Sequence, residues 1–592
     1  MQVYNAPLRD MRFVLHELHD SAGLLRDIGR DDVNQELIDS ILEEAAKFAT
    51  EVLLPINAIG DEEGCKLENG VVRTPRGFKE AYDQFRESGW GALASPAEYG
   101  GQDLPEIVSK MVEEMQCSAN LSFGLYPGLT HGATIAMIGH ATDELKAQYL
   151  PKMIEGIWSG TMNLTEAHCG TDLGMLRTKA VPQDDGSYLV TGEKIFISAG
   201  EHDLTENIIH LVLARLPDAP RGTKGISMFL VPKFLPTGDG RPGRRNGVTC
   251  AAIEHKMGLK GSATCQLVFD EAVGFLVGEP NRGLAAMFTM MNAERLSVGI
   301  QGLGVAETAY QSAVAYAKDR LQGRSLSGVK APDKAADPII VHPDIRRSLM
   351  TIRAYTEGCR ALSGWVAKAL DLEAKATDPE QRQQAADFVA LMTPVVKALF
   401  TDLSFDLAST AVQVYGGHGY IRDHGVEQLV RDARICMIYE GANGIQALDL
   451  VGRKLPAHMG RFMRGFFHPV QDFIEQNAAD PNVVPLARAF GVLQQATAHI
   501  GQAGLKDPEE AGAAATDYLR LLGLVALGYM WARSAKISAE KLPQADGDAS
   551  FYQAKLTTAK FFNDRLLPQT GALWSAIKAG KASMMELEDA AF

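Results

Sequence analysis

The 592-residue sequence lacks the features that mark secreted or membrane-spanning proteins. Its seven cysteines are scattered without a CxxC pair, so we predict reduced, buried thiols in a cytoplasmic protein rather than a disulfide framework. The N-terminal stretch has no basic segment followed by an apolar one, so no signal peptide is predicted. No run of about 18 apolar residues is apparent, and we therefore predict no membrane span.

An excess of basic residues is also missing, since 58 Lys and Arg stand against 73 Asp and Glu, which gives a net charge of −15. Phosphate binding needs clustered basic residues, so no nucleic-acid partner is predicted. Neither HExxH nor grouped Cys and His occurs, which argues against a metal site. The composition, 46% hydrophobic and 22% charged, is ordinary for a globular protein, and the length predicts several domains.

Helical periodicity dominates residues 1–158, which we predict to form an N-terminal helical domain. Apolar residues recur at three- and four-residue intervals over 31–55, and Pro55 is expected to end that helix. Gly- and Pro-bearing loops separate the helices that follow. These further helices are expected over 74–92, 105–120, 128–140 and 143–155.

Residues 159–280 differ, because short β-branched or apolar segments alternate there with Gly, Pro and Asp clusters. An Asp-Asp-Gly turn at 184–186 predicts a hairpin within this middle β domain, which we expect to be a sandwich or barrel. Helical periodicity returns over 281–455, interrupted by an expected loop at 323–343. An additional helical domain of balanced charge, 456–592, follows. Segregated blocks of this kind predict an α+β fold rather than a parallel α/β sheet.

A hydroxyl- and glycine-rich turn lies where the first helical domain meets the β domain. Its residues Thr165, Gly170, Thr171 and Asp172 could offer hydroxyls and N–H groups to a ring edge or a phosphate. An ordinary domain junction would have the same composition, and on this segment alone that interpretation is favoured.

An aromatic side chain and a hydroxyl follow on one predicted strand. Phe196 and Ser198 share a face of that strand, because successive side chains point to opposite sides. The pair suits a planar heterocycle, although a core Phe beside a satisfied Ser is favoured when the segment is taken alone.

Two groups in the second helical region could bind a phosphate-bearing ligand. Arg320 and Arg324 end a helix, where arginines bind diphosphate bidentately or cap the helix. Gln413 precedes Gly416 and Gly417, and such glycines either let a ligand approach the backbone or simply end a helix.

A single acid, Glu440, follows an apolar run at 435–439 and precedes a Gly-Ala-Asn-Gly turn and a helix-patterned stretch. It could be a helix-start acid, favoured by the helix dipole. It could also be a base that is kept poorly solvated so that it can take a proton from carbon.

Taken together, in this order and spacing, the motifs resemble those of the acyl-CoA dehydrogenase flavoenzymes over roughly residues 35–455. The interval from Gln413 to Glu440 also matches that family. The motifs are PAEYGG (96–101), NLTEAHCGTD (163–172), KIFIS (194–198), HKMGLKGSATCQLVFD (255–270), MNAERLSVGIQGLG (291–304), QVYGGHGY (413–420) and RDARICMIYEGANGIQ (431–446).

The resemblance implies an N-terminal helical domain, a middle β domain and a C-terminal four-helix domain, with FAD between the last two and a neighbouring subunit. The additional residues 456–592 resemble a longer subfamily that includes 3-methylthiopropionyl-CoA and broad-range fatty acyl-CoA dehydrogenases, typically homodimers. It further implies an acyl-CoA substrate and an electron-transferring flavoprotein as partner.

Carried over residue by residue, the resemblance implies that Glu440 is the catalytic base. The substrate would lie near Thr171, Arg295 and Gly441. The residues that would contact FAD are Leu164, Thr165, Gly170, Thr171, Phe196, Ser198 and Tyr439, with Arg320, Gln413 and Gly417 reaching the FAD of the partner subunit.

Three departures from the family pattern concern flavin contacts. Ala442-Asn443-Gly444 stands where the family commonly has Thr-Ser-Gln, which removes two side chains that usually contact FAD. Gln322-Gly323 replaces the usual Phe-Gly pair, and Phe196 replaces the commoner Trp.

The implied reaction is α,β-desaturation of an acyl-CoA, in which Glu440 takes the α-proton and a hydride passes to the flavin. The backbone N–H of Glu440 and a ribityl hydroxyl would hold the thioester oxygen, and burial under the acyl chain is expected to raise the pKa of Glu440. An acyl-CoA oxidase that uses O2 is one alternative. A DNA-associated flavoprotein of the same fold is another, disfavoured by the balanced charge after residue 455, and the acyl chain length stays open.

Overall fold

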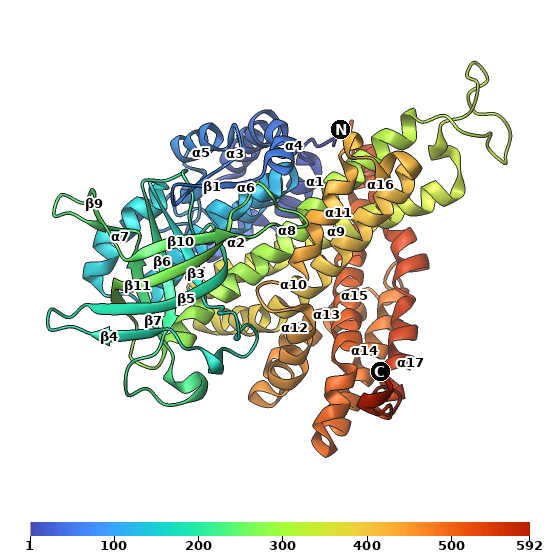
Figure 1. Cartoon of the computed structure of the whole chain (residues 1–592). Helices are drawn as coiled ribbons and strands as arrows, with labels where there is room; N and C mark the ends of the chain where they lie inside the picture. Colours follow the sequence, from blue (N-terminus) through green and yellow to red (C-terminus); the bar gives the residue numbers. More distant parts are fainter. Residues whose placement is uncertain (1) are drawn as a thin grey trace. The chain divides into compact units, whose positions relative to one another are not determined.

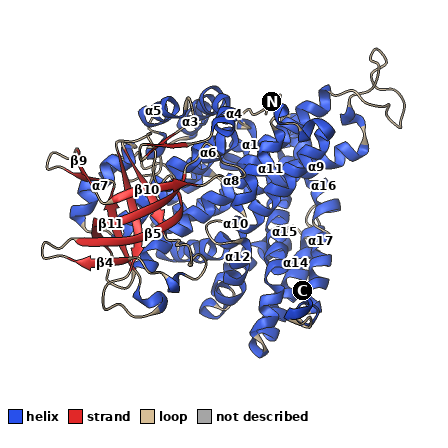
Figure 2. Ribbon diagram, viewed as in Figure 1, coloured by secondary structure: helices blue, strands red, loops and turns tan. Residues whose placement is uncertain are grey.

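The computed structural model describes residues 2–592, and the contacts divide the chain into two compact units. The helical unit contains the residues up to Ala46, Glu106–Ser118 and Val298–Phe592, and the β unit contains Lys47–Pro105 and Ala119–Ser297. Every strand of residues 2–592 belongs to the β unit, as the red arrows of Figure 2 show. The predicted α+β fold, with segregated helical and β-rich blocks, is confirmed.

The β unit is built on a seven-stranded sheet in the order β3-β6-β7-β11-β5-β4, with β10 paired to β11. β11 joins two groups of strands, because its beginning pairs with β5 and β10 and its end with β7. The hairpin predicted at Gly186 is present between β4 and β5, with Gly186 at a φ of 85°. The strands are β1 (Lys66–Glu68), β2 (Val71–Arg73), β3 (Trp158–Asn163), β4 (Lys179–Pro182), β5 (Tyr188–Ser198), β6 (Asn207–Ala214), β7 (Ser227–Pro232), β8 (Phe234–Pro236), β9 (Pro242–Arg245), β10 (Val248–Ile253) and β11 (Thr264–Val277).

The structure corrects two expectations about the helices of the β unit, namely the helix end at Pro55 and the helix range 74–92. Pro55 does not end a helix: α3 (Gln35–Lys47), a π-helical segment, Phe48–Leu53, and α4 (Leu54–Glu63) follow one another without a break, and Pro55 lies just after the π-helical segment. The β1–β2 hairpin that follows was not predicted. α5 (Phe78–Glu87) is shorter than its predicted range, whereas α7 (Asp143–Glu155) has the predicted bounds.

The helices predicted over 105–120 and 128–140 form one element, α6 (Glu106–His140), which contains Pro127. Its backbone leaves the helical conformation at Asn120, at φ −159° and ψ 90°. The buried Asn120 side chain stabilises this kink by accepting a hydrogen bond from the Phe123 N–H and donating one to the Leu53 carbonyl, at 3.0 and 3.3 Å. The loop predicted between the two helices is therefore replaced by a kink within α6, which the hydrogen bonds of Asn120 stabilise.

Long helices make up the helical unit, and Figure 1 shows α10, α13, α14, α15 and α17 as neighbouring rods. α8 (Gly283–Asp319) and α9 (Pro343–Lys375) flank the predicted loop 323–343. The remaining helices are α1 (Leu8–Arg12), α2 (Ser21–Asp27), α3 (Gln35–Lys47), α10 (Pro379–Tyr415), α11 (Val426–Cys436), α12 (Asn443–Asp449), α13 (Arg461–Gln476), α14 (Val484–Lys506), α15 (Pro508–Lys541), α16 (Ala549–Phe561), α17 (Gln569–Ala579) and α18 (Ala582–Met585).

The segment Pro379–Tyr420, which includes α10, is long and apolar enough to cross a membrane by length and composition, although no membrane span was predicted. Within the structure, 78% of its most apolar window is buried against other parts of the protein. That burial is typical of the core helix of a bundle, and α10 packs on α9, α11, α12, α13 and α15.

A buried cluster of charges ties the helical unit together around Arg360 of α9. The guanidinium donates to Asp10, Glu114 and Glu307 at 2.5 to 2.6 Å, so it joins α1, α6 and α8. Lys555 of α16 adds ion pairs to Asp10 and Glu357. Burial raises the pKa of Glu114 to about 7, although the Arg360 charge opposes that rise.

Candidate active site

In the β unit a buried ion pair fixes the turn that follows β3. The Lys194 ammonium donates to the Leu164 carbonyl at 2.9 Å and to the Glu166 carboxylate at 3.0 Å. Burial alone raises the pKa of Glu166, but the Lys194 charge and the N–H groups of Thr178 and Arg177 outweigh it and lower that pKa. Burial also lowers the pKa of Lys194 to about 8. Sequence analysis did not single out Lys194 or Glu166, although both belong to the quoted motifs.

A β-bulge presents Phe196 beside that turn. Cys265 and Leu267 of β11 pair with Ile197 and Lys194 of β5, so β5 carries one extra residue there. Phe196 has a φ of 58° and its ring is 59% exposed. The N–H of Ile195 donates to the Thr165 carbonyl at 3.0 Å, which brings Phe196 next to the turn.

The structure thus brings Leu164, Thr165, Phe196 and Ser198 together at one end of β5. Ser198 is half-buried, and Ile197 between it and Phe196 is buried. Because the bulge and the left-handed Phe196 interrupt the alternation of side chains along β5, the shared face of Phe196 and Ser198 stays a prediction.

Three other sequence-predicted residues of the β unit lie outside this hydrogen-bonded group. Gly170 and Thr171 are exposed in the same loop, which paired backbone hydrogen bonds of 2.9 Å between Glu166 and Cys169 hold closed. Arg295 is half-buried on α8 and donates to Asn292 at 3.2 Å.

The helical unit contains a cleft of about 380 Å³ between the end of α8 and the end of α10. Tyr316 and Tyr415 stack at 4.1 Å between ring centroids, and the Tyr316 hydroxyl hydrogen-bonds to His418 at 2.9 Å. Arg320 and Gly417 both line the cleft. Gln413 is exposed on the last turn of α10, and its carbonyl accepts the Gly416 N–H.

The structure distinguishes the two arginines that sequence analysis left equivalent. Arg324 donates to the carbonyls of Ala331 and Lys334 and to Asp337 at 2.6 to 3.2 Å, so it closes the loop after α8. Backbone N–H groups, that of Ser325 foremost, lower the pKa of Asp337 to about 2. Arg320 lines the cleft instead.

Glu440 lies in the turn between α11 and α12, half-buried and in a left-handed conformation with a φ of 57°. Gly441 follows with a φ of 86°. The preceding Tyr439 donates its hydroxyl hydrogen to Gln301 of α8 and contacts the Cys436 thiol at 3.5 Å. Non-glycine residues adopt such a backbone only when their surroundings impose it, and they cluster at functional sites.

Buried polar side chains donate hydrogen bonds to the backbone carbonyls of the Glu440 turn. Gln446 donates to the carbonyls of Glu440 and Gly441 at 3.2 and 3.1 Å, and Lys397 of α10 donates to the Gly441 carbonyl at 3.0 Å. Sequence analysis missed both residues. Gln446 stood at the end of a quoted motif, but nothing in the sequence relates Lys397 to a residue 44 positions later.

Protein-family models match most of the chain. The N-terminal, middle and C-terminal domain models of acyl-CoA dehydrogenases match residues 35–157, 161–272 and 281–455, and an acetyl-CoA dehydrogenase C-terminal-like model matches 466–588. The chain therefore belongs to the acyl-CoA dehydrogenase family and is an oxidoreductase of that class.

Two full-length relatives and one solved structure show which members of the family this chain is similar to. The chain is 44% identical to 3-methylmercaptopropionyl-CoA dehydrogenase of Ruegeria pomeroyi, covering 97% of this chain and 98% of the relative. It is 34% identical to the broad-specificity linear acyl-CoA dehydrogenase FadE5 of Mycobacterium tuberculosis over 100% of both chains. Its fold is similar to that of an acyl-CoA dehydrogenase of Bacillus anthracis solved with FAD, with a TM-score of 0.74, 20% identity and coverage of 92% of this chain and 88% of that one.

Proposed function

We propose that this protein is a FAD-dependent acyl-CoA dehydrogenase in which Glu440 removes the α-proton of an acyl-CoA thioester. The strained backbone of Glu440 carries the proposal, because a carboxylate in an enforced conformation beside a glycine suits a base that must meet one carbon atom. The backbone N–H of Glu440 would stabilise the charge that develops on the thioester oxygen. One such donor contributes roughly 3 kcal/mol to transition-state stabilisation.

The residues of each unit fit part of FAD. In the β unit the exposed Phe196 and the nearby Ser198 hydroxyl suit a planar heterocycle, with Leu164 and Thr165 held against this end of β5 and Gly170 and Thr171 exposed in the same loop. In the helical unit the cleft with Arg320 and Gly417 suits a diphosphate, with Gln413 close by. When bound, FAD supplies the acceptance of a hydride, which no side chain can provide.

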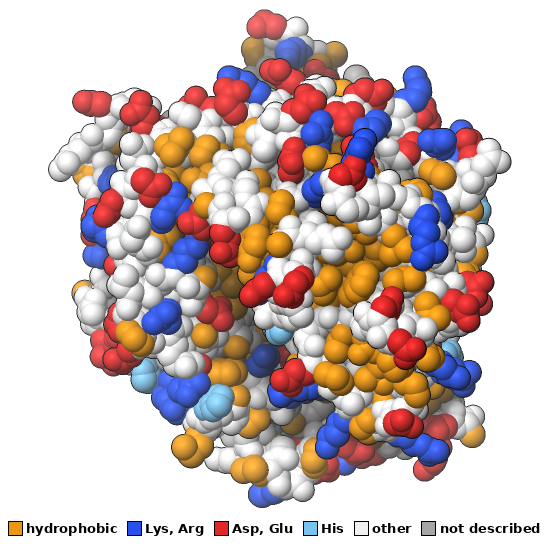
Figure 3. Space-filling model, turned by 90° about the vertical axis from the view of Figure 1, so that its left-hand side faces the viewer, with side chains coloured by type: hydrophobic (Ala, Val, Ile, Leu, Met, Phe, Trp, Pro, Cys, Tyr) orange, Lys and Arg blue, Asp and Glu red, His pale blue; other side chains and the backbone are white. Residues whose placement is uncertain are grey.

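We propose an acyl-CoA of the 3-methylmercaptopropionyl or linear fatty type as the substrate, on the strength of the named relatives. Thr171, Arg295 and Gly441 would lie near it. We further propose a cytoplasmic homodimer that passes its electrons to an electron-transferring flavoprotein. Acidic and basic side chains are interspersed on the face drawn in Figure 3, which lends no support to a nucleic-acid-binding role for that face.

Replacement of the base is the decisive experiment. Glu440→Gln is expected to retain FAD and to bind acyl-CoA but to lose flavin reduction by about 10²- to 10⁴-fold, the usual contribution of a positioned base. Anaerobic bleaching of the flavin in stopped flow measures this rate. Glu475→Gln, which changes an exposed acid on α13, is the matched control. Bleaching at near wild-type rate in Glu440→Gln would remove Glu440 from the proposed role.

The same bleaching assay, run with a panel of acyl-CoA thioesters, tests the substrate. A 3-methylmercaptopropionyl thioester and linear chains of increasing length are compared by the ratio of reduction rate to dissociation constant. Hydrogen peroxide formed in proportion to substrate, without any added acceptor, would favour the oxidase alternative over the dehydrogenase.

A further inference from the structure

Asn443 is one of the residues that replace Thr-Ser-Gln after Glu440, and its side chain donates to α10. We propose that Asn443, together with Lys397 and Gln446, positions Glu440, and that the C-terminal module 456–592 supports this arrangement through α15. These three side chains are called the loop brace below. The inference rests on the proposed role of Glu440.

Lys397 is the centre of the loop brace. It lies on α10 and is fully buried, and its ammonium donates to the Gly441 carbonyl at 3.0 Å and to the Asn443 side-chain carbonyl at 2.8 Å. A buried ammonium is retained only where such acceptors surround it. Its charge is therefore directed at the turn that carries Glu440.

Asn443 is turned toward α10 rather than toward a ligand. Its amide group donates to the Asp402 carboxylate at 2.6 Å, to the Thr401 hydroxyl at 2.9 Å and to the Ala398 carbonyl at 3.2 Å. Asn443, which departs from the family pattern, thus has a structural role, because its hydrogen bonds connect the first residue of α12 to α10.

Gln446 completes the loop brace from within α12. It is 1% exposed, and its amide donates to the two successive carbonyls of Glu440 and Gly441. These bonds fix the orientation of two peptide planes on either side of Gly441. A left-handed backbone is unfavourable for a residue other than glycine, so such restraints are what keep Glu440 in place.

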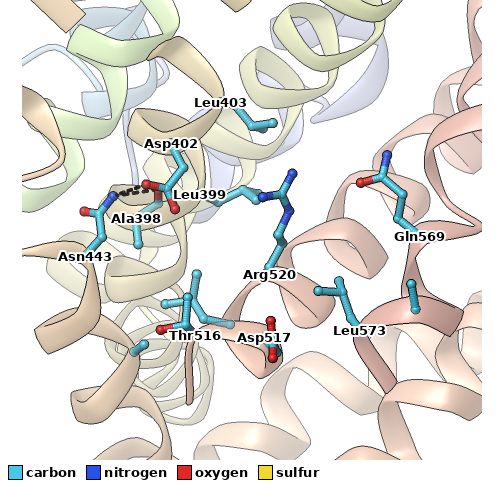
Figure 4. Close-up of a pocket in the computed structure, with 13 residues that line it drawn as sticks. Ala398, Leu399, Asp402, Leu403, Asn443, Thr516, Asp517, Arg520, Gln569 and Leu573 are labelled. Carbon is cyan, nitrogen blue, oxygen red and sulfur yellow. Dashed lines mark hydrogen bonds between the residues drawn. The ribbon is translucent and has the colours of Figure 1, made fainter. Parts of the chain in front are cut away.

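The C-terminal module reaches the loop brace across a cavity of about 270 Å³ formed by α10, α12, α15 and α17. Figure 4 shows Arg520 of α15 pointing into this cavity between Asp402 and Gln569, while Asp402 holds Asn443 on the other side. α12 also packs directly on α15. Burial raises the pKa of Asp402, whereas the bond from Asn443 and the positive charge of Arg520 oppose that rise, so Arg520 supports the ionised form that accepts from Asn443.

The test uses the full-length enzyme with FAD. In Lys397→Met, hydrogen exchange of the peptide 437–446 is expected to accelerate without substrate present. Flavin reduction is expected to slow by about 10- to 100-fold while the substrate dissociation constant changes little, since misplacement of a base affects the reaction more than binding. Lys397→Arg, which keeps charge and donors, is expected to recover most of both.

Lys555→Met is the matched control, because it removes another buried lysine of the helical unit and its ion pairs to Asp10 and Glu357. It is expected to lower stability without accelerating exchange in 437–446 or slowing reduction. Arg520→Met is expected to accelerate exchange in 437–446 to a smaller extent than Lys397→Met. Wild-type exchange in Arg520→Met would overturn the support from the C-terminal module.

The outcomes separate the loop brace from the proposed function. Wild-type exchange of 437–446 in Lys397→Met overturns the loop brace, whatever Glu440→Gln does. Rapid exchange in 437–446 together with an unimpaired reduction rate overturns its role in positioning. An active Glu440→Gln instead overturns the proposed function, and the exchange data still stand.

Discussion

Among residues 2–592, eleven non-glycine residues have a positive φ, and two of them are candidate site residues. Phe196 at 58° and Glu440 at 57° belong to different units, and in each case hydrogen bonds to the neighbouring backbone restrain the turn. Sequence analysis could name these two side chains from their motifs. Their conformation could not be foreseen, because it depends on contacts with residues distant in sequence, such as Thr165 for the Phe196 segment and Lys397 for the Glu440 turn.

Gly416 offers a residue-scale prediction about the cleft. It has a φ of 60° and a ψ of −139°, a region that is essentially restricted to glycine, whereas Gly417 has no positive φ. Gly416→Ala is expected to lower the free energy of unfolding by about 1–3 kcal/mol. Gly417→Ala should stay within roughly 0.5 kcal/mol of wild type, because a Cβ there meets no atom within 4 Å. Urea denaturation followed by circular dichroism compares the two, and equal losses would contradict the assignment.

At the scale of elements, hydroxyls of β3 pair with two buried histidines, one on β6 and one just before it. Thr161 of β3 contacts His210 of β6 at 2.8 Å, and Ser159 contacts His202, just before β6, at 3.0 Å. Burial, with a smaller effect of the Lys233 charge, lowers the pKa of both histidines to about 3. Hydroxyl partners let a neutral imidazole remain in the core of the sheet.

These histidines predict an acid-sensitive β unit. In the unfolded chain a histidine has a pKa of about 6.5, so between about pH 6.5 and 3 the unfolded state binds more protons and stability falls as the pH falls. His210→Asn is expected to make this fall shallower by up to about 1.4 kcal/mol per pH unit. Urea unfolding at pH values from 7 to 4.5 measures the slope, and the exposed His255→Asn is the control. An unchanged slope in His210→Asn would count against a neutral buried His210.

Elements with strong local signals were predictable from sequence, and those decided by tertiary contacts were not. α7 has a Thr142 cap and a Gly156 end, and its bounds match the prediction. Pro55 misled the analysis because a proline can end a helix or, as here, lie just after a π-helical segment within continuous helical structure. The roles of Arg320 and Arg324 were open for the same reason, since only the path of the loop after α8 shows which arginine it uses.

For the whole molecule, the Arg360 cluster explains how segments far apart in sequence form one helical unit. Asp10, Glu114, Glu307 and Lys555 come from four different parts of the chain and meet at or beside one guanidinium. Sequence alone could not reveal this, because each of these residues is an ordinary charged residue on a helix. The sequence likewise left the role of residues 456–592 open. The contacts of α15 and α16 show that this segment packs on other helices of the helical unit.

Removal of the central charge should destabilise the helical unit as a whole. Arg360→Leu leaves several buried carboxylates without their partner, and a loss of about 3–5 kcal/mol or more is expected. Arg347→Leu on the same helix removes an exposed ion pair to Asp344 and should cost less than about 1 kcal/mol. Thermal unfolding by circular dichroism compares the two variants, and similar midpoints would contradict the importance of the cluster.

One helix, α10, carries Lys397 and the acceptors of Asn443 near its middle and Gln413 at its end, where Gly416 begins the cleft. Each residue of an α-helix advances the chain by about 1.5 Å and turns it by about 100°. Insertion of one alanine between Asp402 and Gln413 would therefore swing the end of the helix by more than a quarter turn against its middle. The spacing and relative direction of these two sites are thus set by the number of helical residues that separates them.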